Sequence, residues 1–133
     1  MYKLTQADMI WNRACGKDRL RSRPGDRALA DLIRAHGLAM NGGVFHAVEC
    51  LTARQLSNAA AGYRFYGLHA AASLLLRAKR MLEKFKEFEF HEQQLDAQHA
   101  KIIPGDSSLV RRFEKHLKAN PSDYASLRPK AMG

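Results

Sequence analysis

Residues 39–49, AMNGGVFHAVE, place an Asn-Gly-Gly triplet between two stretches whose apolar residues recur at helical spacing. Two adjacent glycines are poor residues for a helix interior. Asn41 and Gly42 both tolerate the left-handed conformation that ends many helices, and Gly43 lets the chain restart without a side-chain clash. We therefore expect a sharp corner between two helices, with a positive φ at Gly42 or Gly43.

Apolar residues at helical spacing predict further helices along the whole chain. The first is expected from the capping-box pattern at Thr5 and Asp8 up to Gly16. The other helices are expected at about 27–40, 44–51, 53–64, 68–88 and 107–117. Their expected N-caps include Asp26, Thr52, and either Asp106 or Ser107. No strand pattern is of comparable strength, so the sequence predicts an all-α, compact single-domain bundle (1–133) of about five to seven helices.

The segment 68–88 is the longest predicted helix, and we expect it to be the central core helix. Its expected apolar stripe includes Leu74, Leu75, Met81 and Leu82. The pattern then thins over 91–101, which is expected to be either frayed helix or exposed connection. The last residues, 128–133, are expected to form a mobile tail.

The most unusual bulk property is a net charge of +9, from 22 Lys and Arg against 13 Asp and Glu. Such an excess favours contact with nucleic acid, with an acidic protein or with an anionic surface, and says nothing of the fold. No apolar run approaches the roughly 20 residues that span a bilayer. Because the first residues also lack a signal-peptide pattern, we expect a cytoplasmic protein.

The two cysteines, Cys15 and Cys50, lie far apart and in no CxxC spacing. This pattern supports neither a metal knuckle nor a redox motif. We expect two buried, reduced thiols.

Two short motifs carry a family resemblance: Asn41, Gly42 and Gly43 followed by Phe45, and Tyr66 and Gly67 followed by Ala71 and Ala72. Together, over about residues 27–85, they resemble a bacterial family of all-helical domains of unknown function. The best-known member of that family is an acidic DNA-mimic protein. The resemblance implies an interaction module without established catalytic residues. DNA mimicry requires a dense acidic surface, so it is not implied for this basic chain.

Six histidines call for a search for metal and acid–base sites. The run HEQQL at 91–95 begins like a zincin helix, but Leu95 stands where the second ligand belongs. His91 and His99 alone do not complete a metal site. We interpret His36, His46 and His69 as half-buried core histidines. With no nucleophile elbow and no phosphate-binding glycine loop, the sequence predicts no catalytic residue, metal, cofactor or enzymatic activity.

The stretch Arg13–Arg27 is irregular and very basic. Its candidate partner-binding residues are Arg13, Lys17, Arg19, Arg21, Arg23 and Arg27. If the stretch is extended, its alternating cations line one edge and suit phosphates or carboxylates. We expect them to be exposed, and either to bind a partner or only to keep the protein soluble.

Three aromatic residues surround Arg64 just before Gly67, namely Tyr63, Phe65 and Tyr66. We expect them to pack in the core at a helix junction. The alternative is an exposed patch in which Arg64 and Tyr66 anchor a protein partner, because Tyr and Arg dominate interface hot spots.

Our leading hypothesis from the sequence is a non-enzymatic interaction or regulatory protein that binds another macromolecule, for example by neutralising a partner protein. The alternative is a nucleic-acid-binding protein that uses the basic stretch Arg13–Arg27 and the basic face of the 68–88 helix. A third interpretation, a small enzyme, requires a pocket with perturbed titratable groups.

Overall fold

The computed structural model describes residues 4–16, 23–84 and 88–127. These residues contain no strand and form seven α-helices and one 3-10 turn, η1, which confirms the all-α prediction. The helices are α1 (Gln6–Cys15), α2 (Pro24–Gly42), α3 (Val44–Cys50), α4 (Ala53–Phe65), α5 (His69–Lys84), α6 (Phe88–Ile102) and α7 (Asp106–Ala119), and η1 spans Pro121–Asp123. The predicted tail, 128–133, lies outside the described residues.

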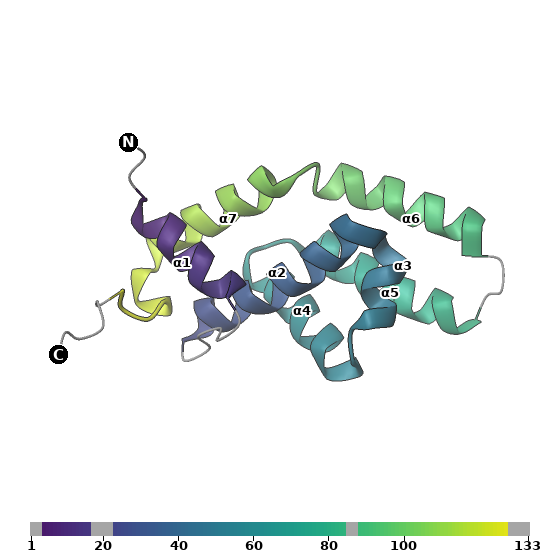
Figure 1. Ribbon diagram of the computed structural model, residues 1–133, viewed down its shortest axis with the longest axis horizontal. Coiled ribbons are helices and arrows are strands. Elements are labelled where there is room, and N and C mark those ends of the chain that lie inside the picture. Colours follow the sequence, from purple (N-terminus) through teal and green to yellow (C-terminus); the bar gives the residue numbers. More distant parts are fainter. Residues whose placement is uncertain (1–3, 17–22, 85–87, 128–133) are drawn as a thin grey trace.

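Two helices share the middle of the bundle (Figure 1). α2 packs against α1, α3, α4 and η1, while α5 packs against α3, α4 and α6. The central position that the sequence predicts for the 68–88 segment is therefore divided between α2 and α5. α6 and α7 follow one another along one long edge of the molecule, joined at Pro104 and Gly105 (Figure 1).

The Asn-Gly-Gly triplet forms the predicted corner, between α2 and α3. α2 continues through Gly42, and Gly43 takes a φ of +94°, which confirms the expected positive φ. The carboxylate of Asp96, on α6, lies against this corner. Its Oδ1 accepts a hydrogen bond of 2.9 Å from the backbone amide of Val44. The first turn of α3 is thus capped by a distant helix rather than by a neighbouring residue.

The apolar stripes become the core largely as predicted. Leu74 and Leu75 of α5 are buried, whereas Met81 and Leu82 are only partly buried. Met40, near the end of α2, is 53% exposed. At Gly62, a Cβ would lie 2.6 Å from the backbone oxygen of Ala28, so the missing side chain lets α4 approach α2 closely.

α6 corrects the prediction for 91–101. This stretch is an internal part of a fifteen-residue helix, not an exposed connection. Leu95 and Ile103 are almost fully buried, at 2% and 1% exposure. Their sequence signal is weak because most of the other described residues of α6 are polar and exposed.

Polar contacts hold the residues that follow α7 against α1 and α2. The Tyr66 hydroxyl donates to the backbone oxygen of Gly25 at 3.0 Å and shares a 2.7 Å hydrogen bond with the Tyr124 hydroxyl. The Asp26 carboxylate, almost fully buried, is paired with Arg13 at 2.8 Å and accepts from the amide of Ala125 at 2.8 Å. A buried charge with these partners is satisfied.

The predicted caps have mixed outcomes. Thr5 and Thr52 both form capping boxes, as expected. Asp26 is not an N-cap, because α2 already begins at Pro24. α7 begins at Asp106 with Gly105 as its N-cap, so the prediction of Asp106 or Ser107 as the cap is also wrong.

Neither cysteine is in a disulfide, but both are exposed, so their predicted burial is wrong. Cys50 lies at the end of the short α3, with its Sγ 3.7 and 3.8 Å from the two ring nitrogens of His46. Within the described ranges, no helix is long and apolar enough to cross a membrane.

Candidate functional site

A basic groove lies between α7 and the turn that joins α4 to α5. We call it the α7 groove. One part has a volume of about 400 Å³ and is lined by Leu68, Ile102, Ser108, Arg111, Arg112 and Lys115. A second part, of about 270 Å³, continues past Phe65 and His116. The two parts are adjacent, because Arg112 and Lys115 line both of them, and the name α7 groove covers the two together.

The sequence of α7 explains why cations line this groove. Leu109, Phe113 and Leu117 recur at intervals of four residues and are buried. The residues between them that turn away from the core are exposed, and they include Arg111, Arg112, Lys115 and Lys118. Burial of the apolar face therefore presents the basic face to solvent.

The opposite wall is the short turn at residues 65–68. Gly67 follows Tyr66, the C-cap of α4, and has a φ of +78°. A Cβ at this residue would lie 3.2 Å from a terminal nitrogen of Arg112. The absence of a side chain at Gly67 thus leaves room for the Arg112 guanidinium beside the turn.

Phe65 is the more exposed of the two neighbouring aromatic residues, Phe65 and Tyr66, that line the second part of the groove. Its ring is partly buried, with its centroid 4.5 Å from that of His116 and 4.9 Å from that of Tyr66. Phe65 also lines a third hollow, of about 240 Å³, which includes Arg27 and Asp31. Phe65 therefore lines both this hollow and the α7 groove.

The charged side chains that line the α7 groove are cationic. None of the described residues that line its two parts is a carboxylate, and three of them are Arg or Lys. His116 also faces the groove and is hydrogen-bonded through Nε2 to Asp123 at 2.7 Å. The guanidinium groups supply planar pairs of donors, which suit phosphate and carboxylate groups.

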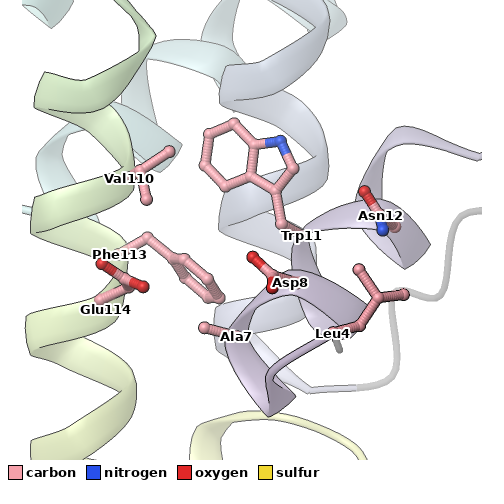
Figure 2. Close-up of a pocket in the computed structure, with 8 residues that line it drawn as sticks. All are labelled: Leu4, Ala7, Asp8, Trp11, Asn12, Val110, Phe113 and Glu114. Atoms are coloured by element: carbon pink, nitrogen blue, oxygen red, sulfur yellow. The ribbon is translucent and has the colours of Figure 1, made fainter. Parts of the chain in front are cut away.

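Another face of α7 borders a smaller hollow of about 190 Å³ against α1 (Figure 2). Figure 2 shows the Trp11 indole over this hollow, beside Val110 and Phe113, with Asp8 close to both rings. The Asp8 carboxylate accepts from the backbone amide of Thr5 at 2.9 Å, as part of the cap of α1. We interpret this hollow as the packing seam between α1 and α7.

The predicted partner-binding residues are not gathered in one place. Arg23, Arg27 and Arg64 are exposed, and Arg27 lies in the hollow that adjoins Phe65. Arg13 is occupied by its ion pair with Asp26 and by the backbone oxygens of Ala125 and Ser126. Lys17, Arg19 and Arg21 lie outside the described residues.

Tyr66 is the clearest correction among those residues. It is only 5% exposed, and its hydroxyl is hydrogen-bonded inside the protein. Burial raises the pKa of its phenol, and the hydrogen bond with Tyr124 raises it further. Core packing at the helix junction is confirmed for Tyr63 and Tyr66, so the alternative of an exposed patch that includes Tyr66 is wrong.

His36 and His99 lie near one another and are buried, whereas His46 and His69 lie closer to the surface. His36 is buried, with Nε2 2.7 Å from Asp106 Oδ1, and its ring centroid lies 6.4 Å from that of His99. Burial lowers the pKa of His99, and the nearby His36 lowers it further. His46 is half-buried as expected, whereas His69 is exposed, contrary to the prediction. Among the described residues, no group of three potential ligands could hold a metal ion.

The sequence analysis missed Arg111, Arg112 and Lys115. A signal was present, because Arg111 and Lys115 fall on the side of the predicted last helix opposite Leu109 and Phe113, and Arg112 falls at its edge. The turn at 65–68 gave no such signal, since its proximity to α7 depends on the packing of the bundle.

Comparison of the chain with protein-family models, with curated proteins and with solved structures gave no match. The resemblance carried by residues 41–45 and 66–72 remains a prediction from the motifs alone. The site must be interpreted from its own geometry.

Proposed function

We propose that this protein is a non-enzymatic interaction protein that binds an anionic macromolecule in the α7 groove. The observation that carries the proposal is the wall formed by Arg111, Arg112 and Lys115, with no carboxylate among the described lining residues. A concave surface with charges of one sign attracts ligands of the opposite sign.

The chemistry of the groove favours binding over catalysis. Its walls offer cations, the Ser108 hydroxyl and the apolar surface of Leu68 and Ile102. This set can hold an anionic partner without making or breaking a bond. The proposal includes a cytoplasmic location, which agrees with two cysteines that are not joined in a disulfide.

Retention on immobilised heparin tests the proposal, because heparin is a polyanion that has neither bases nor peptide bonds. The Arg111→Glu/Arg112→Glu variant is expected to elute at lower salt than the parent protein. The matched control, Arg54→Glu/Arg80→Glu, changes the net charge equally at exposed residues outside the groove. Equal losses in both variants would show that net charge, not the groove, holds the polyanion.

A further inference from the structure

We infer that the α7 groove binds a single strand of nucleic acid, with its phosphates against the basic wall and an unpaired base against Phe65. The inference rests on the proposed function and identifies the partner. It depends on the position of an aromatic ring among cations, which the charge of the groove alone does not require.

The cations are arranged along a line rather than around a point. Arg111 and Lys115 are four residues apart, so they are separated by about 6 Å, slightly more than one helical turn, along the axis of α7. Lys118 is exposed and continues the basic face toward the end of the helix. Such a row contacts successive charges of a chain-like polyanion.

Phe65 provides a surface for a base. It lines the second part of the α7 groove together with Arg112 and Lys115, and it also lines the hollow that contains Arg27 and Asp31. Proteins that bind single strands combine a basic track with aromatic rings on which bases stack. A poly-glutamate chain would use the cations but would offer no flat aromatic group to Phe65.

The recessed position of Phe65 favours an unpaired strand over a duplex. The ring is partly buried, and it lies within a depression bounded by α7 and the 65–68 turn. The bases of a duplex are stacked on one another inside the helix. Contact between Phe65 and a base face therefore requires a strand whose bases are free.

Fluorescence anisotropy with a labelled single strand of about 12 nucleotides tests the inference on the full chain. Contacts with three phosphates predict a slope of log affinity against log salt of about −2. The Arg111→Glu/Arg112→Glu variant is expected to lose most of the affinity, unlike Arg54→Glu/Arg80→Glu.

The Phe65 ring is tested separately. Phe65→Leu keeps an apolar side chain and is expected to weaken binding about fivefold to tenfold with little change in the salt slope. Phe65→Tyr keeps the ring and is expected to retain the affinity. Thermal melting of both variants shows whether the fold is preserved.

Competition assigns the partner. A duplex of equal length and a poly-glutamate peptide are both expected to displace the labelled strand poorly. Stronger competition by the duplex, or an affinity that is unchanged in Phe65→Leu, would overturn the single-strand inference. Preference for poly-glutamate would identify an acidic protein as the partner and leave the proposed function standing. If the protein binds none of the three and is not retained by heparin, the proposed function fails as well.

Discussion

Asp96 of α6 caps the helix that follows Gly43. Its Oδ1 accepts from the Val44 amide at 2.9 Å, and a Cβ at Gly43 would lie 3.0 Å from its Oδ2. This hydrogen bond therefore links the corner between α2 and α3 to the packing of α6. The glycine lets the chain turn, and the carboxylate of a distant helix satisfies the amide that the turn exposes.

Replacing Asp96 with Ala should lower the free energy of unfolding by about 1–2 kcal/mol, because the first turn of α3 loses its side-chain cap. Chemical denaturation measures the change. Gln94→Ala, at an exposed residue of the same helix, is the control and should have almost no effect. Equal stability of the two variants would show that the cap contributes nothing.

Gly43 and Gly37 should respond to alanine in opposite directions. Gly43→Ala is strained because φ is +94°, and its Cβ meets Asp96, so a loss of about 1 kcal/mol or more is expected. Gly37 lies within α2, and a Cβ there meets nothing within 4 Å. Gly37→Ala should raise the stability by about 0.5–1 kcal/mol, since alanine is the better helix former. Thermal melting of the pair checks both signs.

Leu75→Ala should lower the free energy of unfolding by about 2–5 kcal/mol, because it leaves a cavity in the core. Leu75 is 3% exposed in α5. Ser73→Ala changes an exposed residue of the same helix and should remain within about 0.5 kcal/mol of the parent protein. A small effect at Leu75 would contradict its place in the core.

His99 should make the protein less stable in acid. Its pKa is lowered in the folded protein, so below about pH 6.5 the unfolded chain binds the proton more readily. The free energy of unfolding therefore falls as the pH drops through 6.5 and levels off below the folded pKa. Denaturation at several pH values should show a shallower decline in His99→Gln. His69→Gln, at an exposed histidine, should keep the slope of the parent protein.

Buried phenols should make the protein unstable in alkali. Burial raises the pKa of Tyr63, Tyr66 and Tyr124 in the fold, whereas an unfolded tyrosine titrates near pH 10. Above about pH 10 the unfolded chain loses these protons first, so the free energy of unfolding decreases as the pH rises. Phenolate absorbance of these three residues should therefore appear together with the loss of helical circular dichroism. Ionisation of all three in a chain that is still folded would contradict this.

The local signals were sufficient for much of the backbone. Capping boxes at Thr5 and Thr52 and the glycine corner at Gly43 depend on residues close in sequence, and they were predicted correctly. Asp26 was misassigned because its partners, Arg13 and Ala125, come from other parts of the chain. The polar surface of α6 concealed a helix whose buried residues are few.

The candidate site was less predictable than the fold. The basic stretch Arg13–Arg27 is conspicuous in the sequence, yet Arg13 is engaged inside the protein. Arg111 and Arg112 do not stand out in the sequence. They line a groove only because the 65–68 turn lies opposite them in the structure.

The sequence by itself determined six of the seven described helices, all except α6, and most of their inward faces, since apolar periodicity and capping act over only a few residues. The tertiary structure alone decided which cations share a groove, and it alone placed Asp96 at Gly43 and Tyr66 against Tyr124. The physical reason is that each of these relationships joins residues dozens of positions apart. Their proximity depends on how whole helices pack, and no local pattern in the chain encodes that packing.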